Sequence, residues 1–240
     1  KRRSLLFSAT LTDDVMRLAS QWMPDPHVVE IEPDQVAVDT VKQLVYMVRA
    51  NQKFTVLHNL LKRPNIGRVL IFANRRDQTE RIAFELKRYG IECELLSGAV
   101  NQNRRERVLE DFRSGKVMTV VATDVAGRGL HVDDIDHVVN FDLPYEAEDY
   151  VHRIGRTGRA GAEGTAVSFA CEDESFTIPE IEKYIGEELS CKYAEESLLK
   201  PLPHTNAKQY VRPPRTPNRG GRSGGGGRRG GPRSGPPRRR

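Results

Sequence analysis

RVLIFANRRDQTERIAFELKRY, residues 68–89, is the stretch that decides the fold. Residues 69–73 are all apolar, which is typical of a strand that is buried on both faces of a sheet. The residues that follow, 75–89, place Ile82 and Leu86 four apart, on one face of a helix. A buried strand followed directly by an amphipathic helix predicts one unit of an α/β fold.

The same alternation of strand and helix continues on both sides of this stretch. Further strands are predicted over 43–49, 92–96, 118–122, 137–141 and 165–170, and further helices over 52–62, 103–113, 146–153 and 174–186. Short connections between them predict a parallel sheet that is sandwiched by helices. Ligands of such sheets bind beyond the carboxyl ends of the strands, so the loops of interest are 73–76, 97–102, 123–131 and 152–161.

The beginning of the chain does not belong to this alternation. Residues 5–7 are predicted as a strand, and a helix is predicted to follow an N-cap at Thr12. One strand and one helix cannot bury a core. We therefore expect residues 1–30 to be the end of a preceding domain, 31–42 to be a linker, and 43–195 to form one domain.

The end of the chain has a different composition. Residues 204–240 lack hydrophobic periodicity, and 212–240 contain ten Arg, nine Gly, six Pro and no acidic residue. The whole chain has a net charge of +5, so subtracting ten arginines leaves −5 for residues 1–211. This predicts a disordered basic tail on an acidic globular body. Its composition favours the interpretation that the tail binds nucleic acid electrostatically and without regard to sequence. A solubilising tail or a partner-binding peptide is the alternative.

The composition also argues against several classes of protein. No apolar run approaches the roughly 18 residues of a membrane span, and the apolar stretch near the start is too short for a secretory signal. Cys93, Cys171 and Cys191 form no CxxC pair, which favours reduced thiols in a cytoplasmic protein. The six histidines are scattered, so we expect no metal site in this chain.

The segment HRIGRTGRAG, residues 152–161, carries the strongest chemical signal. Arg156 and Arg159 each follow a glycine, so the backbone can approach a ligand closely. Two guanidinium groups suit phosphate oxygens, in particular the charge that develops during phosphoryl transfer. Supplied to a nucleotide that another domain holds, they would act as arginine fingers. From charge alone, a basic surface loop is the alternative.

A second segment, ATDVAGRGLH over residues 122–131, directly follows a predicted buried strand. Thr123 and the glycines of this segment come after the carboxyl end of that strand. A hydroxyl group and exposed backbone N–H groups at this position can bind phosphate. Taken alone, such a loop is common in parallel α/β proteins.

Together with three further segments, these two loops resemble the C-terminal RecA-like domain of DEAD-box RNA helicases. The matching motifs, in family order, are Ser8-Ala9-Thr10, residues 70–74, Ser97-Gly98 with Gln102 and Arg105, residues 122–131, and residues 152–159. The resemblance covers most of residues 1–190. Residues 145–171, His131 and the Arg-rich tail look most like the bacterial RhlB branch of the family.

The resemblance implies a role for each matching residue. Arg156 and Arg159 would be catalytic and, with Gly129 and His131, would bind ATP. Asn74, Gly98, Gln102, Arg105 and Thr123 would line or support an RNA track, and Ser8, Thr10, Asp124, His152 and Arg153 would couple the two domains. Members of the family usually carry Asp where this chain has His131. Here the histidine either donates a weaker hydrogen bond to the ribose or is an inert replacement.

Two motifs of nucleotide hydrolysis do not occur in the sequence. It contains neither GxxxxGK(S/T) nor a DEAD tetrapeptide, and the resemblance implies that these motifs and the Mg²⁺ ligands belong to an N-terminal domain. We expect an ATP-dependent RNA helicase as the intact protein and no ATP hydrolysis by this chain alone. The RhlB resemblance implies bacterial RNA degradation with ribonuclease E. A non-catalytic RNA-binding or adaptor module and a DNA helicase are the alternatives.

Overall fold

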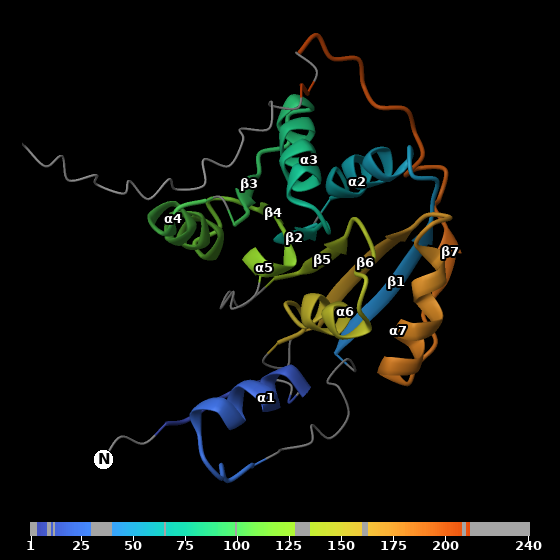
Figure 1. Cartoon of the computed structure of the whole chain (residues 1–240). Coiled ribbons are helices and arrows are strands. Elements are labelled where there is room, and N and C mark those ends of the chain that lie inside the picture. Colours follow the sequence, from blue (N-terminus) through green and yellow to red (C-terminus); the bar gives the residue numbers. More distant parts are fainter. Residues whose placement is uncertain are drawn as a thin grey trace, which may run out of the picture.

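The computed structural model describes residues 4–8, 11, 13–29, 40–64, 66–98, 100–127, 135–159, 163–207 and 210–211. Its centre is a seven-stranded sheet in the order β3-β4-β2-β5-β6-β1-β7 (Figure 1). The strands are β1 (Val41–Met47), β2 (Val69–Phe72), β3 (Glu94–Leu96), β4 (Thr119–Ala122), β5 (His137–Asn140), β6 (Gly164–Ala170) and β7 (Cys191–Tyr193). All neighbours are parallel, so the strands end at one common edge.

Helices cover both faces of this sheet. The helices of the described residues are α1 (Asp13–Trp22), α2 (Lys53–Leu61), α3 (Arg76–Arg88), α4 (Gln102–Arg113), α5 (Asp124–Gly127), α6 (Ala147–Ile154), the 3-10 helix η1 (Ser175–Thr177) and α7 (Ile178–Ile185). Helices α2 and α3 pack on one face, and α4 to α7 pack on the other (Figure 1). The predicted parallel sheet sandwiched by helices is thereby confirmed.

The apolar pattern of β2 explains the two layers. Val69 and Ile71 join the cluster with α2 and α3, whereas Leu70 and Phe72 join the cluster with α4 and α5. All four side chains are at most 2% exposed, because successive residues of a strand point to opposite faces and both faces are covered. Burying each such side chain contributes about 1.5–3 kcal/mol.

The helices follow the spacing of their apolar residues. Ile82 and Leu86 of α3 are 2% and 0% exposed, as their separation by about one turn predicts. Helix α4 begins where the side chain of Asn101 accepts a hydrogen bond from the backbone N–H of Arg104 at 2.9 Å. This bond satisfies one of the amide groups that a helix start leaves without a partner.

Several predicted elements differ from the structure. The predicted strand over residues 5–7 is wrong: residues 4–8 are described without a strand, and Leu5 and Phe7 are 80% and 88% exposed. A strand needs a neighbour to pair with, and the sheet of the described residues offers it none. The predicted strand 43–49 begins earlier, at Val41, which takes in the end of the predicted linker. The predicted helix over 174–186 is divided into η1 and α7.

Two short elements were not predicted. Helix α5 is a single turn inside the loop after β4, and β7 is a short strand whose residues are all exposed. Neither has the apolar repeat by which longer elements are found. Over the described ranges, no helix is both long and apolar enough to cross a lipid bilayer.

After β7 the chain returns across α2 and α3, and we call residues 194–207 and 210–211 the strap. Leu198 of the strap is 1% exposed in the core. Its carbonyl accepts a hydrogen bond from the Asn59 amide at 2.9 Å, and the rings of Phe84 and Tyr210 lie 5.4 Å apart. Tyr210 of the strap therefore lies against α3. The predicted disordered tail lies, from residue 212 on, outside the described residues.

Candidate functional site: the carboxyl edge of the sheet

Strands β4, β2 and β5 are neighbours, so the residues that follow them lie together at one edge. Asn74 follows β2, Asp124 follows β4 and Asp142 follows β5. Arg153 of α6 reaches all of them. Its Nε and Nη2 donate to the two carboxylate oxygens of Asp124 at 2.5 and 2.7 Å, its Nη2 donates to Oδ1 of Asn74 at 2.6 Å, and its Nη1 donates to the backbone carbonyl of Asp142 at 2.7 Å.

Arg153 is only 1% exposed, so its charge is almost completely removed from water. A guanidinium group stays charged in proteins, so its burial requires acceptors and a counter-charge in fixed positions. Asp124 supplies the counter-charge through a bidentate pair, and the Phe72 ring lies 5.4 Å from the guanidinium carbon. The network ties the end of α6 to the strand ends.

Arg156 and Arg159 follow directly in the loop after α6. The backbone N–H of Arg156 donates to the Arg153 carbonyl at 3.1 Å. The Nε of Arg156 donates to the His152 carbonyl at 3.1 Å, and that of Arg159 donates to the Gly155 carbonyl at 2.8 Å. Both arginines are half-buried.

The two guanidinium groups are close enough to repel each other. Burial, and next the charge of Arg159, lower the pKa of Arg156 from its ordinary value. An anion placed between the two groups would offset both effects, because its negative charge would attract each guanidinium group. Arg156 also lines a small hollow with Gly127 of α5 and Asp149 of α6. The pair of guanidinium groups, rather than this hollow with its Asp149 carboxylate, suits a phosphate group.

The loop that carries these arginines is bonded to residues that precede β5 and β1, at the amino edge of the sheet, and not beyond the carboxyl strand ends where it was expected. The hydroxyl of Thr157 donates to the carbonyl of Ile135, and the hydroxyl of Thr40 donates to the carbonyl of Gly158 at 2.8 Å. Gly158 has a φ of +67°, and a Cβ at this position would lie 2.7 Å from a methyl group of Val41. Glycine is therefore required here for both backbone conformation and space.

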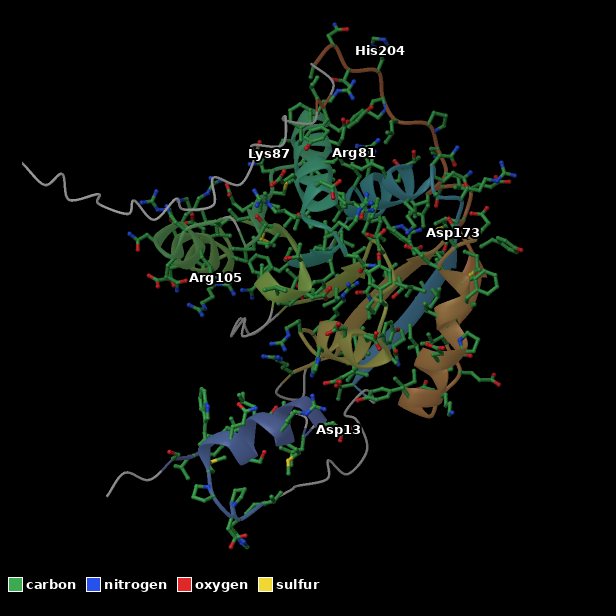
Figure 2. All side chains as sticks on the ribbon, in the orientation of Figure 1. Asp13, Arg81, Lys87, Arg105, Asp173 and His204 are labelled. Atoms are coloured by element: carbon green, nitrogen blue, oxygen red, sulfur yellow. The ribbon has the colours of Figure 1, made fainter. Side chains whose placement is uncertain are left out.

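The residues that the sequence assigned to RNA lie along the same edge. Thr123 follows β4, and Gly98 follows the adjacent strand β3, at an exposed position where an added Cβ would have no atom within 4 Å. Gln102 begins α4 and donates to Glu106 at 3.0 Å, and Arg105 lies on the same helix (Figure 2). Asn74 differs from these residues, because its side chain is bonded inside the domain, to Arg153 and to the carbonyl of Leu143.

The residues assigned to interdomain coupling are more dispersed. Asp124 and Arg153 are paired, and both ring nitrogens of His152 lie 3.9 Å from a carboxylate oxygen, of Glu148 and of Asp149. Ser8 is exposed in the segment before α1. Thr10, Gly129 and His131 lie outside the described residues. In the part of the chain that the structure describes, no group of three His, Cys, Asp or Glu side chains could hold a metal ion.

Sequence reasoning missed Asp142 and Lys53. The carboxylate of Asp142 accepts from the Asn74 backbone N–H at 3.2 Å, from Gln78 at 2.9 Å and from Lys53 at 3.1 Å. The signal for Asp142 was available, because this residue closely follows a buried strand of a parallel sheet. No sequence pattern marks Lys53, which lies in a helix start far from these strand ends along the chain.

The sequence of the chain is similar to those of known helicases. The family model "Helicase conserved C-terminal domain" matches residues 52–161. The chain is 55% identical over 203 residues to the ATP-dependent RNA helicase RhlB of Pseudomonas aeruginosa (strain UCBPP-PA14), covering 85% of this chain and 51% of that protein. It is 44% identical over 204 residues to RhlB of Xanthomonas campestris pv. campestris (strain B100), covering 85% and 36%. The chain thus spans about half of these relatives or less.

Solved structures give the same result. The DEAD-box protein SrmB of E. coli, bound to regulator of ribonuclease activity A, is 33% identical with a TM-score of 0.63, and the match covers 70% of this chain and 98% of that one. Dbp5 L327V of S. cerevisiae, bound to RNA and ADP BeF3, is 34% identical with a TM-score of 0.69, covering 80% and 51%. With the parallel sheet and the arginine-bearing loop at its edge, these matches show that the chain belongs to the DEAD-box RNA helicase family, as a C-terminal RecA-like domain close to RhlB.

Proposed function

We propose that this domain supplies the second half of an ATP-driven RNA helicase in the intact protein. The observation that carries the proposal is the Arg153 network, which ties α6, the helix that leads into the loop of Arg156 and Arg159, to the residues that follow β2, β4 and β5. The relatives' names, ATP-dependent RNA helicase, support the reaction. In this proposal the two arginines complete a nucleotide site whose other residues lie on an N-terminal domain.

The residues present suit the phosphates of ATP. Arg156 and Arg159 offer guanidinium donors, and burial and the charge of Arg159 lower the pKa of Arg156, which a bound anion would oppose. Bound ATP supplies the terminal phosphoryl group whose transfer to water drives the cycle. The arginines would stabilise the charge that develops on this group, and Gly129 and His131 would lie beside the ribose. In this proposal Mg²⁺ binds to the N-terminal domain.

The RNA track in this proposal runs along the strand ends. Thr123, Gly98, Gln102 and Arg105 would contact the sugar-phosphate backbone, and Asn74 would support the track from within the domain. Contacts to phosphate and sugar carry little sequence information, so binding would be sequence-tolerant. Closure of the two domains would bend one strand and so unwind short duplexes or remodel RNA-protein complexes.

The tail and the cellular role complete the proposal. Ten arginines in residues 212–240 would attract RNA by releasing counterions, independently of sequence. From the resemblance to the RhlB branch we also propose a cytoplasmic role in bacterial RNA degradation, with ribonuclease E as partner.

The test is Arg156→Ala in the full-length protein. RNA-stimulated ATP turnover is expected to fall by about 10³-fold, the size of an arginine-finger contribution, while ATP binding stays within about threefold. Arg63→Ala, which removes an exposed ion pair to Glu195 on the strap, is the matched control and should turn over as the wild type does. Wild-type turnover by Arg156→Ala would refute the role of this arginine, and no ATP turnover by the wild type would favour the non-catalytic adaptor.

A further inference from the structure

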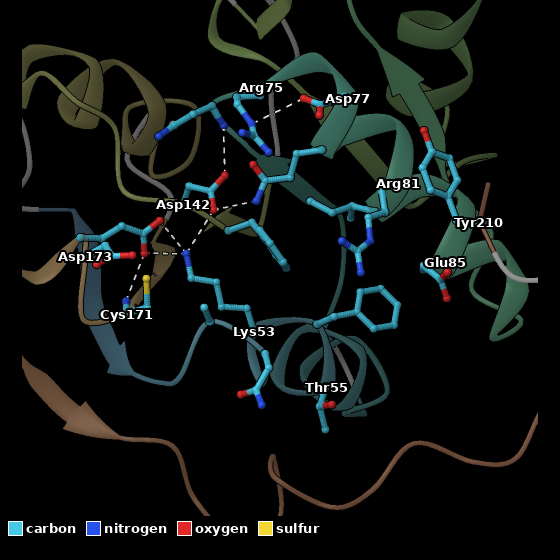
Figure 3. A pocket seen from close by; sticks show the side chains of 18 of the residues that line it. Lys53, Thr55, Arg75, Asp77, Arg81, Glu85, Asp142, Cys171, Asp173 and Tyr210 are labelled. Carbon is cyan, nitrogen blue, oxygen red and sulfur yellow. Dashed lines mark hydrogen bonds and ion pairs between the residues drawn. The ribbon is translucent and has the colours of Figure 1, made fainter. Parts of the chain in front are cut away.

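A groove of about 1100 Å³ is lined by residues of α2 and α3, and one buried cation is part of its lining (Figure 3). This cation is Lys53, in the first turn of α2, which is only 4% exposed. Its Nζ donates to the carboxylate of Glu174 at 2.6 and 2.5 Å and to Oδ1 of Asp142 at 3.1 Å. Lysine is almost never fully buried in proteins unless it is paired, and here it is paired twice.

Asp142 connects Lys53 to the candidate active site. Its Oδ1 accepts from Lys53 and from Gln78, and its Oδ2 accepts from the backbone N–H of Asn74. Its backbone carbonyl accepts from Arg153 at 2.7 Å. Asp142 thus has the Lys53 ammonium on its groove side and the Arg153 guanidinium on its active-site side.

The electrostatics of the cluster require the lysine. Asp142 and Glu174 are two carboxylates whose side chains are 8% and 20% exposed, and Lys53 is bonded to both. Without the lysine the two carboxylates would repel each other in a site of low water content. The Asp142 carboxylate would also lose one of the three donors that bond to it. A displaced Asp142 would move both the Asn74 backbone and the carbonyl on which Arg153 rests.

Arg153 in turn sets the place of Arg156, whose backbone N–H donates to the Arg153 carbonyl at 3.1 Å. A displacement of about 1 Å in a catalytic group costs up to about a hundredfold in rate. We propose that Lys53 is a positioning residue, which acts through Asp142 and Arg153 to hold the two arginines in the place that phosphoryl transfer requires. This inference rests on the proposed function and deepens it.

The first experiment is Lys53→Met in the full-length protein. The RNA-stimulated kcat is expected to fall by about tenfold or more, with KM for ATP changed less than about threefold, because positioning affects the transition state more than binding. Lys53→Arg keeps the charge and should recover to within about threefold of the wild type. The matched control is Arg88→Met, which breaks a half-buried ion pair to Glu85 in the same groove without contacting Asp142.

The second measurement separates positioning from general destabilisation. In the 240-residue chain, the NMR signal of the Arg153 Nε–H reports its bond to Asp124. In Lys53→Met this proton should exchange with solvent about tenfold faster or more, because the network opens more often, while Arg88→Met leaves it unchanged. Equal exchange rates in wild type and Lys53→Met would overturn the proposal.

A charge-matched variant covers the case in which Lys53→Met does not fold. Lys53→Met/Glu174→Gln removes one charge of each sign, so the net charge of the cluster is kept. Its kcat and its Arg153 exchange should change in the same direction as those of the single variant but less, because the repulsion between the two carboxylates is gone while Asp142 still lacks the Lys53 donor. Wild-type kcat in a folded double variant would refute the positioning role. In that case a large effect of Arg156→Ala would leave the proposed function standing, so the two failures are distinguishable.

Discussion

Arg153 and Asp124 form a bidentate ion pair, with N–O distances of 2.5 and 2.7 Å, between α6 and the loop after β4. Arg153 is 1% exposed, and Asp124 supplies its counter-charge. Breaking a buried pair from one side leaves the other charge without compensation. The stability of the domain and the place of the arginine-bearing loop therefore depend on the same contact.

Removal of the Asp124 charge should destabilise the domain. Asp124→Asn is expected to lower the free energy of unfolding by about 3 kcal/mol, because the buried Arg153 guanidinium loses its counter-charge. Urea unfolding of the 240-residue chain measures this change. Arg63→Ala removes an exposed pair and should cost less than about 1 kcal/mol. Equal losses in the two variants would show that the buried pair has no special weight.

Gly158 should tolerate alanine far less than another glycine of similar backbone conformation. Gly158 and Gly186 have φ of +67° and +72°, but of the two only Gly158 has atoms that a Cβ would meet, the nearest being 2.7 Å away on Val41. Gly186→Ala should cost about 1 kcal/mol for backbone conformation alone. Gly158→Ala should cost at least about 1 kcal/mol more because of the steric clash. Similar unfolding midpoints of the two variants in urea would contradict this.

The stability of the chain should decrease in mild acid through His137. Burial lowers the pKa of His137 from its ordinary 6.5, although Asp136 opposes the shift. Below pH 6.5 the unfolded chain binds a proton at His137 that the folded chain does not bind. The free energy of unfolding therefore decreases as the pH is lowered, by at most about 1.4 kcal/mol per pH unit. His137→Gln should show a smaller decrease between about pH 7 and pH 5 in urea unfolding. The same slope in both proteins would rule His137 out.

The three cysteines should differ strongly in reactivity. Cys191 is exposed on the edge strand β7, whereas burial raises the pKa of Cys93 to about 12. Only a thiolate attacks a disulfide reagent, so at about pH 8 Cys191 should be labelled first and Cys93 only after unfolding. Mass spectrometry of timed samples gives the order. Labelling of Cys93 at the rate of Cys191 in the folded chain would be incompatible with a buried thiol.

The basic tail should determine the salt dependence of RNA binding. A chain that ends at residue 211 lacks ten arginines, and the plot of log affinity against log salt should become shallower by about 0.7 for each phosphate that the tail had neutralised. Titration of a single-stranded RNA at several salt concentrations measures both slopes. An unchanged slope would favour a solubilising or partner-binding tail.

Long apolar repeats made most of the fold predictable. Residues 69–72 and the pair Ile82 and Leu86 lie where their spacing placed them, in a buried strand and on the inner face of a helix. The short elements α5 and β7 escaped prediction because a single turn and an exposed strand have no repeat. Gly98 and Thr123 could be located from the rule of strand ends alone. Lys53 could not, because its partners come from distant parts of the chain and only the folded sheet brings them together.

The strand order has a consequence for how the domain is made. β1 lies between β6 and β7, so Val41 pairs with Gly164 and Val45 with Cys191. During synthesis from the N-terminus, β1 leaves the ribosome before the other strands of this sheet. Its apolar side chains stay exposed until β6 and β7, near the end of the domain, have been made. Pairings so distant along the chain form slowly, and β1 is then the segment that a chaperone would have to shield.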